Sequence, residues 1–214
     1  MRILIFSLTG LFLQGCTPSQ QSMVETFSAS LRGAPDVTVA DDDIQSLPYS
    51  TMYLRLNGGQ RIFVVLGYRE NGLDKWLTQD RAVIVTRSGR LVKTVGLRSN
   101  LLEVTNLDGD PLMNAARLHN GARWQRDVRW SEEGEPRSAR LISTFTPAGD
   151  AALTIAGQRV DTQVWRESVR ASVPQREWQN TFWIEKTTGL VRQSQQMIGA
   201  GVLPAETMLL KPIP

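Results

Sequence analysis

Hydrophobic and polar residues alternate along short segments from Thr51 to the end of the chain. Met52, Leu54 and Leu56, for example, are separated by more polar side chains. Such alternation is typical of a β-strand with one buried face, because successive side chains point to opposite sides of the sheet. About a dozen such segments, with few helical ones between them, predict an all-β domain that is either a sandwich or an open barrel.

Tight turns separate the predicted strands. Asn57-Gly58-Gly59, Glu70-Asn71-Gly72 and Ser88-Gly89 supply residues that adopt a positive φ, so they favour hairpins and a meander. The segment Asp108–Leu118 is predicted to hold turn residues and a helical turn. The strands are predicted over Thr51–Leu56, Arg61–Tyr68, Lys75–Gln79, Ala82–Arg87, Arg90–Val95, Asn100–Thr105, Ala122–Ser131, Arg137–Phe145, Ala151–Ile155, Arg159–Val169, Trp178–Glu185, Leu190–Gln196 and Val202–Leu210.

Two short helices are predicted ahead of the strands. Every fourth residue from Met23 to Leu31 is apolar, which suits a short amphipathic helix. The acidic triplet Asp41–Asp43 predicts the start of a second helix, with Asp42 as the cap, Gln45 as its reciprocal partner and Pro48 as the stop. A calcium loop is the alternative for the triplet, but such loops place carboxylates at alternate positions.

The first sixteen residues have the pattern of a secreted lipoprotein precursor. Arg2 is a positive n-region, and the apolar stretch up to Leu13 fits a signal peptide of about 7–15 apolar residues. A membrane-spanning helix would need about 20 such residues. Leu13-Gln14-Gly15-Cys16 resembles the bacterial lipobox, in which cleavage falls between Gly15 and Cys16 and the thiol is acylated. The alternatives are a plain signal peptide with an incidental cysteine and a small N-terminal anchor helix.

Cys16 is the only cysteine of the chain, so an internal disulfide is excluded and acylation accounts for the thiol. We expect residues 1–15 to be a lipoprotein signal peptide, 16–22 an acylated tether and 23–214 a single β-rich periplasmic domain. No cofactor is expected beyond the covalent acyl or diacylglycerol lipid on Cys16. Thr17 follows the cysteine where an aspartate would favour the inner membrane, so resemblance to enterobacterial lipoproteins implies the outer membrane.

Charge and residue types limit the function further. The 24 Lys and Arg and 21 Asp and Glu are interleaved and give a formal net charge of +3, so no nucleic-acid footprint is visible. His119 is the only histidine, which excludes a zinc site built from cysteine and histidine. A serine–histidine–aspartate triad would have to use His119, and the chain has no G-x-S-x-G elbow. We therefore expect His119 to lie in a loop.

A glycosidase would need only two suitably spaced carboxylates. Sequence spacing favours no pair among the candidates Asp80, Glu103, Asp108, Asp110, Asp127 and Glu185. Asp108-Gly109-Asp110 fits either a turn or the start of a calcium loop, and a turn is favoured because no distal ligand follows. We assign no catalytic residue and no metal site.

The chain has 6 tryptophans, which either pack in the core or stack on sugar rings. Trp124 and Trp130 are an even number of positions apart on one predicted strand, so they are expected on the same face. Trp183 shares a face with Glu185 and is expected to be half exposed. Core packing is the main expectation for each ring, and contact with a glycan or partner is the alternative for Trp183, Trp124 and Trp130.

Several segments match a known family in their order along the chain. They are VADDDIQSLPYSTMYLRLNGGQRIFVVLGY, KWLTQDRAVIVTRSGRLVKTVGL, the tripeptide Asp110-Pro111-Leu112 and NTFWIEKTTGLVRQSQQMIG. With them the chain resembles the YjbF/GfcB family of outer-membrane lipoproteins over essentially the whole mature sequence. The resemblance implies a single antiparallel, strongly curved sheet. It supplies no catalytic residue, and Cys16 alone carries over as a functional position.

Relatives in this family are encoded with genes for capsule or exopolysaccharide production and export. The resemblance therefore implies a non-enzymatic accessory lipoprotein, anchored in the outer membrane by its lipid and facing the periplasm. It would bind a polysaccharide-export protein or the surface polysaccharide itself. One alternative is a lipid or lipoprotein carrier with an apolar cavity, and another is a polysaccharide-modifying enzyme.

Overall fold

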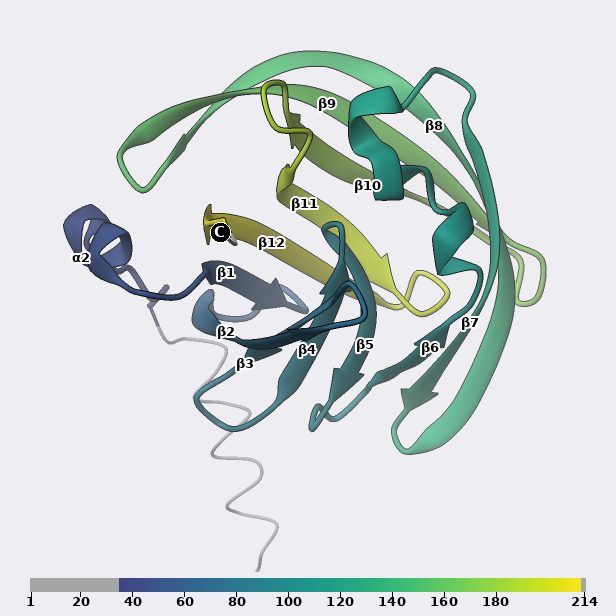
Figure 1. Ribbon diagram of the computed structural model, residues 1–214. Helices are drawn as coiled ribbons and strands as arrows, with labels where there is room; N and C mark the ends of the chain where they lie inside the picture. Colours follow the sequence, from purple (N-terminus) through teal and green to yellow (C-terminus); the bar gives the residue numbers. More distant parts are fainter. Residues whose placement is uncertain (1–34, 213–214) are drawn as a thin grey trace, which may run out of the picture. The chain divides into compact units, whose positions relative to one another are not determined.

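The computed structural model describes residues 35–212, in which twelve strands form one antiparallel sheet (Figure 1). The strand order is β5-β4-β3-β2-β1-β12-β11-β10-β9-β8-β7-β6. The predicted signal peptide, tether and helix between Met23 and Leu31 lie outside the described residues.

The strands predicted from the alternation pattern are present, with boundaries that differ by a few residues. The helical segments are α2 (Asp41–Ser46), η1 (Leu107–Gly109) and η2 (Pro111–Arg117). The strands are β1 (Thr51–Leu56), β2 (Ile62–Glu70), β3 (Leu73–Leu77), β4 (Val83–Arg87), β5 (Arg90–Val95), β6 (Leu101–Val104), β7 (Arg123–Glu132), β8 (Glu135–Ile155), β9 (Gln158–Ala171), β10 (Arg176–Glu185), β11 (Val191–Ile198) and β12 (Leu203–Lys211).

The first and last strands lie in the middle of the sheet, because β1 pairs with β12, for example at Tyr53 and Met208. The consecutive strands β5 and β6 are instead its two edges. They meet at a seam made by side chains, where the Leu101 amide donates to the Thr94 hydroxyl at 2.9 Å. The expected single, strongly curved meander is confirmed, and the sheet is nearly closed on itself.

One long strand replaces two predicted ones. Arg137–Phe145 and Ala151–Ile155 both belong to β8, which runs for 21 residues. Its register against β9 shifts between Pro147 and Asp150, and Gly149 has a φ of 94° there. Residues that normally form turns therefore make an irregularity of the β-bulge type, which bends the strand without ending it.

The helix α2 differs from the prediction in its cap. Its N-cap is Ala40 and no side chain caps it, so the capping box predicted for Asp42 and Gln45 is wrong. Asp41–Asp43 occupy the first turn, where negative charge interacts favourably with the helix dipole. Ile44, the buried residue of the helix, joins a hydrophobic cluster with residues of β1, β8, β9 and β12.

The inner face of the sheet carries the main hydrophobic core. A second cluster forms where Leu112 of η2 packs on inward side chains of β8–β11, and Figure 1 shows η2 inside the curve. Burial of each large apolar side chain contributes roughly 1.5–3 kcal/mol. The main core includes Met52, Leu54, Val64, Trp76, Ile84, Leu91, Leu101, Trp124, Val128, Trp130, Leu141, Val169 and Ile198.

A buried charge cluster lies within the same interior. It consists of Arg90 on β5, Asp110 before η2, Arg126 on β7 and Glu167 on β9. The Arg90 guanidinium contacts Glu167 at 2.6 Å and Asp110 at 2.8 Å. Arg126 Nη1 lies 3.2 Å from Glu167 Oε1, an ionic contact without hydrogen-bond geometry. Asn180 Nδ2 donates to Glu167 Oε2 at 2.8 Å.

Mutual attraction keeps these groups charged. Burial raises the pKa of Glu167, but Arg90 and Arg126 outweigh it and lower the pKa to about 2. Burial lowers the pKa of Arg126 to about 10, although Glu167 acts in the opposite direction. Burial also opposes the charge of Arg90, whose pKa is nevertheless raised by Asp110 and Glu167. The two cations and two anions therefore balance one another in the interior.

The Glu167→Gln variant tests this balance. It leaves Arg126 buried without its carboxylate, and breaking a buried ion pair in this way costs about 3–5 kcal/mol. We expect the free energy of unfolding, measured by urea titration at neutral pH, to fall by about that amount.

Glu177→Gln is the matched control, because Glu177 pairs with Arg170 at 2.9 Å on the surface. Exposed ion pairs contribute about 1 kcal/mol or less. Equal losses of stability in the two variants would contradict a special role for the buried carboxylate.

Acid should destabilise the protein partly through Glu167. Its pKa is lower in the folded protein than in the unfolded chain, where it is about 4.3. Its contribution, on the order of 3 kcal/mol, is therefore complete above about pH 5 and is lost as the pH falls toward 2. Urea titrations over this range should show a shallower decline for Glu167→Gln than for the unmodified protein. Both proteins should keep some loss of stability in acid, because they share other carboxylates with a lowered pKa, namely Asp36, Glu70, Asp127 and Glu185. If stability fell equally steeply with pH in both proteins, Glu167 would not contribute to the acid sensitivity.

Candidate functional site

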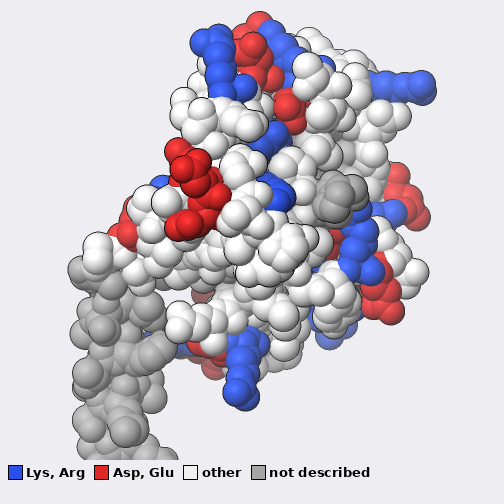
Figure 2. All heavy atoms as spheres, turned by 60° about the vertical axis from the view of Figure 1, so that its left-hand side comes forward, with Lys and Arg blue, Asp and Glu red and all other residues white. Residues whose placement is uncertain are grey.

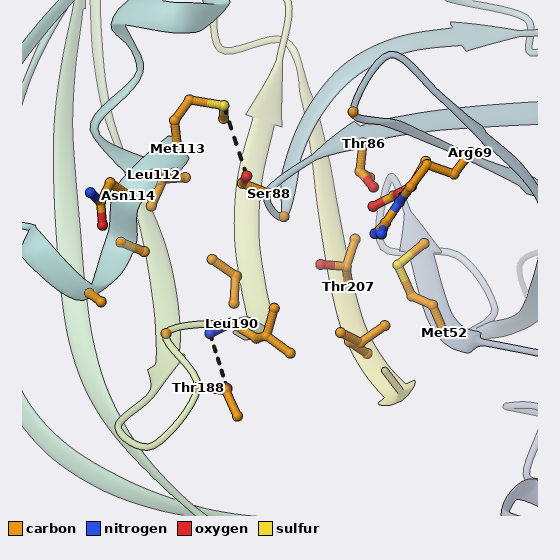
Figure 3. A pocket seen from close by; sticks show the side chains of 18 of the residues that line it. Met52, Arg69, Thr86, Ser88, Leu112, Met113, Asn114, Thr188, Leu190 and Thr207 are labelled. Carbon is orange, nitrogen blue, oxygen red and sulfur yellow. Dashed lines mark hydrogen bonds and ion pairs between the residues drawn. The ribbon is translucent and has the colours of Figure 1, made fainter. Parts of the chain in front are cut away.

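A pocket of about 500 Å³ opens on the inner side of the sheet (Figure 3). This volume lies within the range of about 300–1,000 Å³ that is usual for ligand sites. Its walls come from β2–β4, from η2 and from the turn between β10 and β11, with β1 and β12 between them. The lining residues are Met52, Arg69, Gly72, Asp74, Trp76, Thr86, Ser88, Gly89, Leu112, Met113, Asn114, Ala115, Ala116, Thr188, Gly189, Leu190, Val191, Thr207 and Leu209.

Two glycines let the walls approach one another. Gly89 has a φ of 81°, and a Cβ there would lie 2.5 Å from the Cβ of Val191. Gly189 has a φ of 72°, and a Cβ there would lie 3.1 Å from the Cβ of Ala116. Glycine alone combines this backbone conformation with so close an approach. Backbone packing at these two glycines therefore fixes how closely the walls of the pocket approach each other.

The two charged groups of the pocket lie on one side, close to a buried hydrogen bond. Arg69 Nε donates to Asp74 Oδ1 at 2.6 Å, and Trp76 Nε1 donates to the Thr86 hydroxyl at 2.8 Å. Figure 3 shows the guanidinium of Arg69 near the hydroxyl of Thr86, with Thr207 and Met52 beside them. Arg69 and Asp74 are the two charged residues among those that line the pocket, so the lining is neutral as a whole.

Glu185 holds the turn that forms the opposite wall. Its carboxylate accepts hydrogen bonds from the Thr188 hydroxyl at 2.7 Å and from Arg192 Nη1 at 3.0 Å. Burial raises the pKa of Glu185, but these hydrogen bonds lower it overall. The Gly189 amide also donates to the Glu185 carbonyl at 2.9 Å. The ionised carboxylate thus fixes the turn from Lys186 to Gly189.

Trp124 and Trp130 lie in the main core, with exposed fractions of 2% and 4%. They share the inner face of β7, as the sequence indicates. The guanidinium groups of Arg126 and Arg90 lie 4.0 and 4.7 Å from the Trp124 ring centroid, an arrangement that favours cations over the ring face. These buried rings present no free face to a sugar, so the structure places both in the packing role that the sequence left open.

Trp183 lies on the outer face of β10 and is half buried. Its partners on the neighbouring strands are Val164 and Gln193. Arg166 and Gln195, which flank Thr181 two positions away, are exposed on the same face. An aromatic ring bordered by amide and guanidinium groups is suited to stacking on a sugar, so Trp183 remains a candidate contact.

The carboxylates that the sequence offered for catalysis are mostly engaged with arginines. Asp110 is buried against Arg90, and Glu185 pairs with Arg192. The surface pairs are Asp127 with Arg140, Glu103 with Arg129 and Asp108 with Arg87, while Asp80 accepts from the Thr78 hydroxyl. Asp110 also caps η2 by accepting from the Leu112 amide, while Asp108 and Gly109 belong to the single 3-10 turn η1 just before it.

Glu167 is a buried charged residue that the sequence pattern alone does not single out. Glu167 lies two positions from Trp165 and two from Val169 along β9, so all three side chains point to the same, buried face of the strand. This even spacing is the sequence signal that could have identified Glu167 as inward-facing. A catalytic general acid needs a raised pKa near the working pH. The pKa of Glu167 is lowered, which suits a structural anion and not a proton donor.

Charged side chains of both signs are interspersed over the face shown in Figure 2. His119 follows η2 and is exposed, in the loop where the sequence predicts it.

Within residues 35–212, no three histidine, cysteine or acidic side chains gather as a metal-binding group. In the same part of the chain, none of the helices has the length and apolar character needed to cross a membrane.

Comparisons with known proteins agree with the segments that suggested a family. The family described as "Group 4 capsule polysaccharide lipoprotein gfcB, YjbF" matches residues 24–210. The chain is 60% identical over 214 residues to the uncharacterized lipoprotein GfcB of Escherichia coli (strain K12), with 100% of both chains covered. It is 41% identical over 201 residues to the uncharacterized lipoprotein YjbF of the same strain, covering 94% of this chain and 93% of YjbF.

A solved structure supports the fold. The crystal structure of the hypothetical lipoprotein YmcC from Escherichia coli (K12) superposes with a TM-score of 0.81 at 59% sequence identity. The superposition covers 92% of this chain and 99% of YmcC. With the family match over most of its length, the chain belongs to the YjbF family of group 4 capsule polysaccharide lipoproteins.

Proposed function

We propose that this chain is a non-enzymatic outer-membrane lipoprotein that assists capsule or exopolysaccharide assembly or export. It acts by binding a partner protein or the glycan on the periplasmic side of the membrane. The observation that carries the proposal is membership of a family described by its capsule polysaccharide, with a match over residues 24–210.

The acylated Cys16 supplies the membrane attachment in this proposal. A single acyl chain binds a membrane only marginally, whereas two hydrophobic signals give stable anchoring. Lipoproteins with a lipobox carry several acyl chains on this cysteine, so Cys16 would supply enough hydrophobic signal for stable anchoring. The body that begins at Pro35 would then work close to the inner surface of the outer membrane.

A binding role fits the described side chains better than catalysis or lipid transport. The buried carboxylates Asp110 and Glu167 are committed to Arg90, which argues against a polysaccharide-modifying enzyme built on them. The lipid-carrier alternative needs an apolar cavity, whereas the pocket contains the ion pair of Arg69 and Asp74. Removing such groups from water without a polar partner is costly, so an acyl chain is a poor occupant.

Gene deletion with complementation tests the function. Deletion should reduce or alter the surface polysaccharide of the parent cells, measured as cell-associated polymer and by its size on gels. The unmodified gene should restore it. Cys16→Ala should not, because that protein lacks its lipid and should leave the outer-membrane fraction.

Ser22→Ala, a change in the predicted tether, is the matched control and should behave like the unmodified protein. A normal polysaccharide in the deletion strain would refute the accessory role. Full outer-membrane fractionation of Cys16→Ala would refute the lipid-anchor mechanism by itself.

A further inference from the structure

The pocket bounded by β2–β4, η2 and the turn before β11 allows a class of ligand to be named. We propose that it binds an uncharged, hydroxyl-bearing segment of a saccharide. The inference rests on the proposed function, since it assigns the glycan-binding site of a protein that assists surface polysaccharide. It places that site on the inner side of the sheet and not at Trp183.

The charges that line the pocket favour a neutral ligand. Arg69 and Asp74 face each other at 2.6 Å, and their side chains are 49% and 11% exposed. An anionic ligand would have to compete with Asp74 for the guanidinium, and a cationic ligand would compete with Arg69. A hydroxyl group avoids both conflicts, because it can accept from a second N–H of Arg69 and donate to the carboxylate.

Apolar groups lie within reach of the same polar ones. Met52 lies beside Thr207, while Met113 and Leu190 lie on the opposite side (Figure 3), and Leu209 also lines the pocket. Sugar rings have this dual character, since hydroxyls radiate from a body of C–H groups. Methionine suits such a surface because its flexible thioether adapts to irregular shapes.

The backbone around the pocket argues against an extended peptide. Peptides commonly bind by adding a strand to an exposed sheet edge. Here β1, β3, β4, β11 and β12 each have a neighbouring strand on both sides, so their hydrogen-bonding edges are occupied. The recognition groups in the pocket are therefore mainly side chains, which suits a ligand whose own polar groups are hydroxyls.

The test uses the protein from Cys16 onward with Cys16→Ser, purified without lipid. The probes are oligosaccharides released by mild acid from the surface polysaccharide of the parent cells, separated into neutral and anionic pools. Saturation-transfer NMR should detect binding of the neutral pool at millimolar concentrations. Arg69→Ala should weaken this binding at least about tenfold, which corresponds to the loss of one strong polar contact.

Arg140→Ala is the matched control, because Arg140 pairs with Asp127 at 2.8 Å on a surface away from the pocket, and it should bind normally. Leu190→Trp is a second pocket variant. Leu190 is 40% exposed at the rim, so a larger side chain can be accommodated there while it blocks entry. Circular dichroism verifies that each variant is folded.

Four results would overturn the inference. These are no binding of the neutral pool, tighter binding of the anionic pool, unchanged binding in folded Arg69→Ala and Leu190→Trp, and loss of binding in Trp183→Ala alone. If any of them occurs while deletion still alters the surface polysaccharide, the pocket assignment fails and the proposed function stands. If deletion has no effect but the neutral pool binds as described, the function fails and the site stands.

Discussion

Glu167 lies in the interior of the sheet, where the guanidinium of Arg90 contacts one oxygen of its carboxylate and that of Arg126 contacts the other. Moving a carboxylate or a guanidinium out of water is costly, and only close opposite charges offset that cost. Because the members come from β5, β7, β9 and the start of η2, the cluster is complete only when these distant segments meet. It therefore specifies how the two halves of the sheet come together near its open seam.

The pocket depends on the same interaction. Arg90 directly follows the Ser88-Gly89 turn, and Asp110 directly precedes η2, so their ion pair fixes two of the pocket walls relative to each other. Gly89 then packs on Val191 at the third wall. A charge cluster that takes no part in binding thus positions the side chains that would bind a ligand.

Local signals in the sequence were sufficient for most strands and turns. Asn57, Asn71 and Ser88 all have positive φ at the hairpins where the sequence predicts them. Properties that depend on distant contacts were not predictable. No local pattern shows that β1 pairs with β12, or that Gly149 sits in a bend within one strand. Arg126 on β7 and Glu167 on β9 alternate in step with the buried residues of their strands, but only the fold shows that they meet.

The most direct measurement of the balance around Glu167 is the stability of the double variant Arg126→Met with Glu167→Gln. Removing one cation and one anion leaves Arg90 and Asp110 as a neutral pair, so the interior no longer holds an uncompensated charge. The free energy of unfolding of the double variant should therefore be higher than that of Glu167→Gln alone. A double variant whose loss equals the sum of the two single losses would contradict the claim that these charges act as one unit.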